Sequence, residues 1–266
     1  MMTKNHCPIG VFDSGLGGLT AVKELMRQLP SEDIVYFGDT ARVPYGTKSK
    51  EAIIHFSHEN AEFLLKHKVK MIVVACNSSS SFALESLRKA YPLPIVGVIV
   101  PGACKAVQMT RKQKVGIIAT SATINSKEYE RTIKGIDKNI KVINQACPLF
   151  VPLVEEGWFH HSVAQEVAKA YLKPLVLAKV DVLILGCTHY PLLRNVIQKI
   201  MGPKVYLVDS AKEAANNVKE LLDVMGIAHR KSHRARYQFF VSDKPQHFKK
   251  LAKRFLGCEI KNIKKV

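Results

Sequence analysis

Met71-Ile72-Val73-Val74-Ala75-Cys76-Asn77 and Val182-Leu183-Ile184-Leu185-Gly186-Cys187-Thr188 share one design: an apolar run that ends in a small residue, a cysteine and a polar residue. A short unbroken apolar run is typical of a strand buried in a parallel sheet. Open α/β folds bind their ligands outside the carboxyl ends of such strands. We therefore expect two thiols at sheet edges, where both could face one substrate.

The likeness extends to the neighbours of these two stretches. Four successive apolar runs recur in one order at spacings of about 106 to 111 residues. The matched pairs are 9–12 with 115–118, 35–36 with 142–143, the two cysteine runs, and 95–99 with 205–208. Such a repeat predicts two α/β halves of about 100 residues each, descended from one unit.

Helical patterns fill the gaps between these runs. In the first half they cover 20–29, 51–67 and 80–90, and in the second they cover 161–177, interrupted by Pro174, and 192–201. The alternation predicts a doubly wound, mainly parallel sheet in each half. Residues from 212 onward have no counterpart in the first half, and they predict a helix at 213–225, a strand at 237–241 and a helix at 245–255. Packing of this tail on the first half is favoured, although the sequence alone does not place it.

Length and composition favour a two-domain cytoplasmic protein. The 266 residues exceed a typical single core. No stretch reaches the roughly 18 apolar residues of a membrane span, and residues 1–6 lead into a strand rather than into a signal-peptide hydrophobic region. The six cysteines form no Cys-x-x-Cys motif and no close pair, so reduced thiols are expected rather than a disulfide framework or a zinc knuckle.

The first strand leads into Asp13-Ser14-Gly15-Leu16-Gly17-Gly18. Glycines allow close approach, and the turn offers backbone N–H groups and a carboxylate at one place. As a dinucleotide fingerprint it is weak, because the usual order of glycines and the acidic ribose ligand are missing. A tight strand-to-helix turn capped by Asp13 is the simpler interpretation.

Two further segments carry polar groups after strands. Thr40-Ala41-Arg42-Val43-Pro44-Tyr45-Gly46-Thr47 is either a plain loop or a rigid turn in which Tyr45 presents its backbone or hydroxyl to a ligand. Thr120 and Thr123 could hold an anion or cap the next helix, and capping is favoured in isolation.

Cys187-Thr188-His189-Tyr190-Pro191 is a more specific signal, because it combines a thiol, a hydroxyl and a titratable imidazole directly after a strand. This combination favours a chemical site. A metal site is the rival hypothesis, with His160 or His161 joining Cys187 and His189. No close pair of ligands supports it, so no metal is expected.

Taken together, these motifs resemble bacterial glutamate racemases, of the cofactor-independent aspartate/glutamate racemase superfamily. The resemblance spans roughly residues 9–210 and rests on Asp13-Ser14-Gly15, Pro44-Tyr45-Gly46, Ala75-Cys76-Asn77, Thr120 with Thr123, Val151-Pro152-Leu153-Val154-Glu155 and Gly186-Cys187-Thr188-His189-Tyr190-Pro191. The family usually has Thr after the Cys-Asn pair and a small residue next, whereas this chain has Ser78 and Ser79. The hydroxyl is kept and a methyl group is lost.

The resemblance implies two α/β domains with the active site in the interdomain cleft. The first would comprise 1–99 plus 211–266 and carry Cys76, and the second would comprise 100–210 and carry Cys187. It implies interconversion of L- and D-glutamate for peptidoglycan, with no cofactor. The implied catalytic residues are Cys76, Cys187, Asp13, His189 and Glu155. The implied substrate-binding residues are Asp13, Ser14, Pro44, Tyr45, Gly46, Asn77, Ser78, Thr120, Thr123, Thr188 and His189.

A physical argument supports two thiols. Inverting Cα without a cofactor requires removing a proton from one face and delivering another to the opposite face, so two acid/base groups must flank the carbon. A free cysteine has a pKa of about 8.5, and one thiolate must coexist with one thiol. We expect each cysteine at the start of a helix, whose N–H groups favour the anion.

The net charge of +18 exceeds what a small dicarboxylate requires. Residues 226–266 hold 12 Lys and Arg against 2 Asp and Glu. This segment could bind nucleic acid through phosphate contacts, although no stacking platform or recognition helix is visible and basic segments are often solvated faces. Three hypotheses remain: a glutamate racemase, which leads, a racemase of aspartate or a related acid, and a basic nucleic-acid-binding protein on this scaffold. A homodimer is compatible with each.

Overall fold

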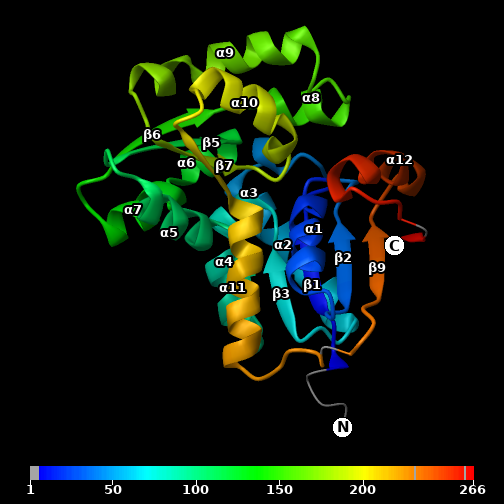
Figure 1. The fold of residues 1–266 in the computed structure, drawn as a ribbon. Helices are drawn as coiled ribbons and strands as arrows, with labels where there is room; N and C mark the ends of the chain where they lie inside the picture. Colours follow the sequence, from blue (N-terminus) through cyan, green and yellow to red (C-terminus); the bar gives the residue numbers. More distant parts are fainter. Residues whose placement is uncertain (1–5, 231, 261) are drawn as a thin grey trace.

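The structure, a computed structural model, describes residues 6–230, 232–260 and 262–266. The start of the predicted N-terminal lead-in and two lysines of the basic segment, Lys231 and Lys261, lie outside these residues. Within them, the strands form two separate sheets, each flanked by helices (Figure 1). All neighbouring strands in both sheets run parallel.

The first sheet has six strands in the order β10-β9-β2-β1-β3-β4. These are β1 (Ile9–Asp13), β2 (Ile34–Gly38), β3 (Met71–Val74), β4 (Ile95–Gly97), β9 (Tyr237–Val241) and β10 (Ile263–Lys265). The second sheet has the order β6-β5-β7-β8. Its strands are β5 (Lys114–Ala119), β6 (Lys141–Ala146), β7 (Val182–Gly186) and β8 (Tyr206–Asp209).

The two sheets repeat one topology. The order β2-β1-β3-β4 in the first corresponds strand for strand to β6-β5-β7-β8 in the second. Strands β3 and β7, which precede the two cysteines, occupy equivalent positions, and every residue of both is buried. The predicted pair of pseudo-symmetric, doubly wound α/β units is therefore confirmed.

The C-terminal tail returns to the first sheet. Strand β9 pairs with β2, beginning with Ile34 opposite Tyr237, and β10 pairs with β9. Helices α5 (Ile99–Met109) and α11 (Ser210–Val224) begin next to the predicted domain boundaries and pack against each other, and α11 also packs along α1 (Leu19–Gln28). The division into 1–99 plus 211–266 and 100–210 stays a prediction.

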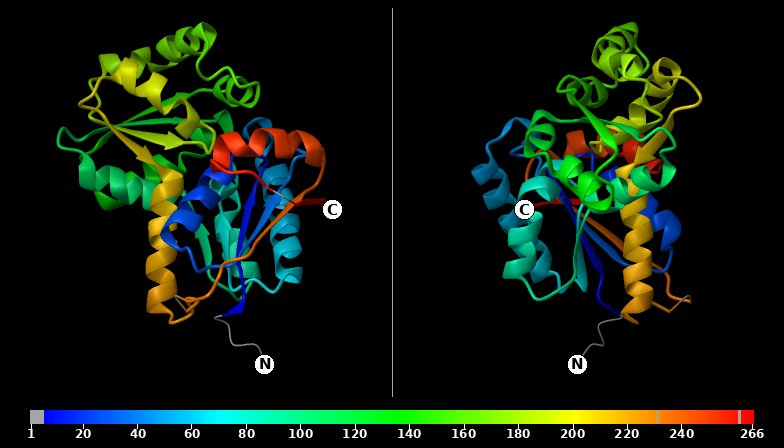
Figure 2. Two further views of the ribbon diagram at one scale, coloured as in Figure 1. Left: turned by 45° about the vertical axis from the view of Figure 1, so that its right-hand side comes forward. Right: turned by 90° about the vertical axis from the view of Figure 1, so that its left-hand side faces the viewer.

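The remaining helices cover the sheet faces, where their apolar sides are buried. They are α2 (Lys50–Lys66), α3 (Asn77–Phe82), α4 (Leu84–Ala90), α6 (Ser121–Ser126), α7 (Glu128–Ile136), α8 (Phe150–Glu155), α9 (Ser162–Leu177), α10 (Arg194–Met201) and α12 (Pro245–Leu256). Short 3-10 helices occupy Tyr45–Thr47 and Tyr190–Leu193. Figure 2 shows α12, drawn in red, at the level between the two sheets.

Three element predictions were wrong in detail. The helix predicted at 80–90 begins already at Asn77 and is broken at Ala83. The strand predicted at 95–99 ends at Gly97, and Ile99 begins α5. Pro174 does not interrupt α9, whose Ala164, Ala168, Leu172 and Leu175 are all buried. Burial of this apolar face outweighs the hydrogen bond that proline removes.

The largest buried cluster joins both halves, with Leu25 of α1, Leu185 of β7, Val218 of α11 and Phe255 of α12 among its members. Packing across the halves fixes how the two sheets face each other. No helix among the described residues combines the length and apolar character needed to cross a membrane.

Candidate functional site

A narrow cavity lies where the loops after the strands of the two sheets meet, and both cysteines line it. Its lining residues are Ser14, Val43, Pro44, Tyr45, Gly46, Cys76, Asn77, Ser78, Thr120, Val151, Cys187, Thr188 and His189. Its volume is about 20 Å³. Pockets that enclose small ligands usually have about 300–1,000 Å³, so the cleft is closed in this conformation.

Cys76 lies two residues after the end of β3 and is 5% exposed. Burial, and next to it the charge of Asp13, raise the pKa of the Cys76 thiol to about 11. Hydrogen bonds from Ser79 and Ser14 oppose this rise. Helix α3 begins right after Cys76, as predicted, but desolvation outweighs its effect on the anion. Cys76 is therefore a protonated thiol at neutral pH.

Cys187 belongs to a chain of three polar side chains. Its Sγ lies 3.8 Å from Nδ1 of His189, and Nε2 of His189 lies 3.0 Å from Oε1 of Glu155. Burial by itself lowers the pKa of His189, but hydrogen bonds and charges of Cys187 and Glu155 outweigh it and raise this pKa to about 10. An imidazolium therefore stands beside Cys187 at neutral pH.

The expectation that Cys187 stands at a helix start was wrong. A 3-10 turn begins three residues later at Tyr190, and α10 begins only at Arg194. The charge beside this thiol comes from His189 instead. His189 also packs edge-on against Phe255 of α12, with ring centroids 5.4 Å apart.

Asp13 is fully buried at the end of β1 and does not line the cavity. Its Oδ2 accepts a hydrogen bond from the Gly15 N–H at 3.1 Å, whereas its Oδ1 has no hydrogen-bond partner among the described residues. Burial raises the pKa of Asp13, and the charge of His189 and nearby N–H groups counteract it. The N-cap of α1 is Gly18, without a side-chain cap, so Asp13 caps the turn and not the helix.

Gly17 in this turn allows close packing on the second half. A Cβ at Gly17 would lie 2.1 Å from Oγ1 of Thr188 and 2.6 Å from Nδ1 of His189. The hydroxyl of Thr20 donates to the backbone oxygen of Thr188 at 3.1 Å. The turn therefore packs against the loop that carries Cys187 and fixes its position.

Three hydroxyl groups gather on the Cys76 side. Oγ of Ser78 lies 3.1 Å from Oγ1 of Thr120 and 3.4 Å from Oγ1 of Thr123. Thr120 also caps α6 by accepting from the Thr123 N–H, so the capping prediction is confirmed. Thr123 does not line the cavity. Asn77 accepts at Oδ1 from the Tyr129 hydroxyl at 2.7 Å, and its buried Nδ2 has no hydrogen-bond partner in the described part of the chain.

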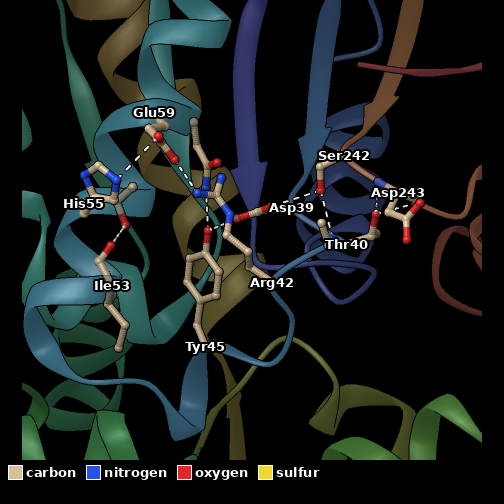
Figure 3. A network of polar contacts seen from close by, with 12 residues as sticks. Asp39, Thr40, Arg42, Tyr45, Ile53, His55, Glu59, Ser242 and Asp243 are labelled. Atoms are coloured by element: carbon tan, nitrogen blue, oxygen red, sulfur yellow. Dashed lines mark hydrogen bonds and ion pairs between the residues drawn. The ribbon is translucent and has the colours of Figure 1, made fainter.

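The polar network shown in Figure 3 holds the loop after β2 in place. The Tyr45 hydroxyl donates to Asp39, which is buried and also pairs with Nε of Arg42 at 2.7 Å. Nδ2 of Asn60 donates to the same hydroxyl at 3.1 Å. The suggestion that this hydroxyl faces a ligand was therefore wrong. The same loop brings Gly46 so close to Thr120 that an added Cβ would lie 2.6 Å from its Cβ.

The sequence interpretation missed several residues around the cavity. Val43 and Val151 form apolar parts of its wall, and the backbone N–H of Ser79 opposes the rise in the pKa of Cys76. Spacing from Cys76 could have indicated Ser79, because it lies in the first turn of the following helix. Nothing could have indicated Phe255, because the tail that carries it has no counterpart in the repeat.

The rival metal site at Cys187 is not supported. His161 caps α9 through its Nδ1, and His160 packs on Phe159. Among the described residues, the group with the spacing of metal ligands lies elsewhere and includes neither Cys187 nor His189.

Known proteins are similar to this chain in sequence and in fold. The Asp/Glu/Hydantoin racemase family matches residues 9–218. A glutamate racemase from Geobacter metallireducens is 49% identical over 258 residues, which cover 97% of this chain and 96% of the relative. A glutamate racemase isoform from Bacillus anthracis superposes with a TM-score of 0.95 at 40% identity, covering 98% of both chains. The glutamate racemase from Francisella tularensis, solved in complex with D-glutamate, gives a TM-score of 0.92 at 40% identity and the same coverage. This chain therefore belongs to the Asp/Glu/Hydantoin racemase family, and its glutamate racemase relatives match it over nearly its whole length.

Proposed function

We propose that the chain interconverts L- and D-glutamate without a cofactor, with Cys76 and Cys187 as acid/base groups on opposite faces of Cα. The observation that carries this proposal is the shared cavity. Both cysteines line it, each from the loop after an equivalent strand of the two related sheets.

The reaction is a pair of proton transfers. One cysteine, as thiolate, takes the proton from Cα, and the other, as thiol, delivers its proton to the opposite face. The two cysteines exchange protonation states in each turnover. The next substrate of the opposite hand then restores the starting state.

The described arrangement favours one of these two states. The pKa of Cys76, about 11, keeps its proton in place. His189, whose pKa is about 10, places a positive charge beside Cys187, where it would stabilise the negative charge of the proton-abstracting form. In this state Cys187 is the base and Cys76 the acid. Glu155 holds the imidazolium in position from its other side.

Negative charge develops on the α-carboxylate as Cα loses its proton, so donors aimed at that group lower the barrier. The unpaired Nδ2 of Asn77 is suited to this task, because it is buried and lacks any other described partner. The hydroxyls of Ser14, Ser78, Thr120 and Thr188 supply further donors and acceptors on the wall for the amine and the carboxylates.

The closed cavity implies movement. A space of about 20 Å³ does not admit glutamate, so the two halves must separate for binding and close again for reaction. The hydrogen bond between Thr20 and Thr188, the contact of Ser78 with Thr120 and the hydrogen bond from Tyr129 to Asn77 are among the polar links that opening would strain. Closure would exclude water from the carbanion.

The test uses purified protein in deuterated buffer with no pyridoxal phosphate added. Circular dichroism follows loss of optical activity, and proton NMR follows exchange of the Cα proton. Cys76→Ala and Cys187→Ala should each abolish racemisation while retaining the far-ultraviolet spectrum. Cys258→Ala, at an exposed cysteine, is the matched control. Normal turnover by either cavity variant, or a requirement for pyridoxal phosphate, would overturn the two-thiol proposal.

The physiological role follows from this activity. We propose that the protein supplies D-glutamate for peptidoglycan in the cytoplasm and that it functions as a homodimer. Depletion in a bacterial host should be rescued by added D-glutamate, and sedimentation velocity should give the mass of two chains. Growth of depleted cells without added D-glutamate would contradict the proposed role in peptidoglycan synthesis. A monomer at micromolar protein concentration would contradict the proposed homodimer.

A further inference from the structure

We propose that Asp33, His229 and His233 form a binding site for one divalent transition-metal ion such as Zn²⁺. The site lies at the amino-terminal end of strand β2 in the first sheet, because Asp33 directly precedes this strand. The cavity loops leave the other end of the same strand, beginning at Asp39. The proposed site is therefore separate from the cysteine cavity.

The geometry brings three potential ligands together, one carboxylate and two imidazoles. Each of the three residues offers one ligand atom, and these atoms lie within 4.8 Å of one another. Nε2 of His233 lies 2.8 Å from Oδ1 of Asp33, which also accepts from the Arg236 N–H at 2.7 Å. The rings of His229 and His233 are stacked with centroids 4.1 Å apart and an interplanar angle of 10°.

His229 supplies an independent reason to expect a ligand. Its side chain is buried, with the residue only 8% exposed, and its Nε2 has no hydrogen-bond partner among the described residues. A buried polar atom without a partner is costly. A neutral imidazole nitrogen is also the commonest metal ligand in proteins, so an ion would satisfy this atom.

The backbone around His229 is already fixed. Its N–H donates to Oε1 of Glu32 at 2.7 Å, and the carbonyl of Ile227 accepts from Nζ of Lys70 at 2.8 Å. Lys70 and Glu32 are themselves ion-paired at 2.6 Å, with both side chains at most 3% exposed. This buried pair anchors the segment that presents His229, so little ordering would be needed when an ion binds.

The ligand set selects the class of ion. Two imidazoles and one carboxylate suit Zn²⁺, Co²⁺ or Ni²⁺, whereas Mg²⁺ and Ca²⁺ prefer oxygen ligands. Nearly parallel rings do not aim their lone pairs at one point, so His233, whose side chain is 24% exposed, must tilt out of the stack. The ion then replaces the proton shared between His233 and Asp33, and a water would complete four-fold coordination.

An ion here would act on the fold and not on the reaction. It would tie the segment between α11 and β9 to β2, next to the pairing of Ile34 with Tyr237. This is where the C-terminal tail rejoins the first sheet. We therefore expect bound metal to raise the melting temperature while the racemisation rate of the folded enzyme stays unchanged.

The experiment uses the full chain without a polyhistidine tag, first stripped of metal. Co²⁺ titration followed by visible absorption gives stoichiometry and ligand type, and calorimetry gives the melting temperature with Zn²⁺. His233→Gln and Asp33→Asn are the test variants, since both side chains are partly exposed and less critical for folding than His229. His160→Gln is the matched control, at an exposed histidine outside the cluster.

Wild type and His160→Gln should each bind one equivalent of metal. Their melting temperatures should rise by about 5 °C when the metal concentration is a hundred-fold above Kd. In His233→Gln and Asp33→Asn the affinity for the metal should fall at least about ten-fold. The rise in melting temperature on adding metal, measured from each variant's own metal-free value, should become smaller as well. An equal gain in these variants, or no gain in wild type, would overturn the proposal. An intense thiolate-to-cobalt band that His233→Gln leaves unchanged would also overturn it, because the ion would then sit on cysteine.

Discussion

Replacing Glu155 by Gln should shift the alkaline limit of activity to lower pH. In the structure His189 carries its proton up to a pKa of about 10, held there by Cys187 and by Glu155 at 3.0 Å. As pH rises through this value, His189 loses the positive charge that attracts the thiolate. Activity should therefore be present below the pKa of His189 and fall above it.

The size of the shift follows from the distance. Two unit charges 3.0 Å apart interact by about 1.4 kcal/mol at the dielectric constant of water, and by about four times as much at an effective value of 20. The Glu155 side chain is 28% exposed, so water screens part of this interaction. One pKa unit corresponds to about 1.4 kcal/mol, and we expect a shift of about 1 to 2 units.

The assay is the pH profile of kcat/KM by circular dichroism, which reports the free enzyme. Because the two enantiomers have equal free energy, kcat/KM must be the same in both directions at every pH, and this equality is an internal check. Glu156→Gln, at the exposed neighbouring carboxylate, is the control. An alkaline limb that stays in place in Glu155→Gln, or moves equally in Glu156→Gln, would refute the assigned role of this carboxylate.

Further predictions concern packing and charge. Gly17→Ala should lower kcat/KM about 100-fold without unfolding the protein, because the new Cβ would displace Thr188 beside the thiol; wild-type kinetics would argue against this close packing. Tyr45→Phe should lower the free energy of unfolding, measured in denaturant, by about 1–3 kcal/mol, because the buried Asp39 loses a hydrogen-bond donor, and kcat should stay nearly unchanged. A large loss of kcat at full stability would indicate instead that the hydroxyl contacts the substrate. Fluorescence anisotropy should detect no DNA binding by the basic segment 226–266 at physiological salt, and salt-dependent binding there that disappears when its lysines are neutralised would revive the nucleic-acid hypothesis.

Local sequence patterns were sufficient to predict much of the fold. The buried runs at β3 and β7 could be recognised because a parallel strand covered on both faces is apolar throughout. The strand at Tyr237–Val241 was predicted with its observed bounds, but its pairing with β2 was not, because pairing joins residues about 200 positions apart. Strand β6 is half exposed along its length, so its pattern indicates a strand only weakly.

The sequence by itself determined which chemical groups this protein can use and in what repeated order, because thiols, hydroxyls and strand periodicity are properties of neighbouring residues. Only the tertiary structure decided the environment of each group. It keeps Cys76 protonated through burial, turns the Tyr45 hydroxyl toward Asp39, and brings His233 to Asp33 from 200 residues away. Desolvation and long-range contact depend on what the folded chain places around a residue, and no local pattern records that.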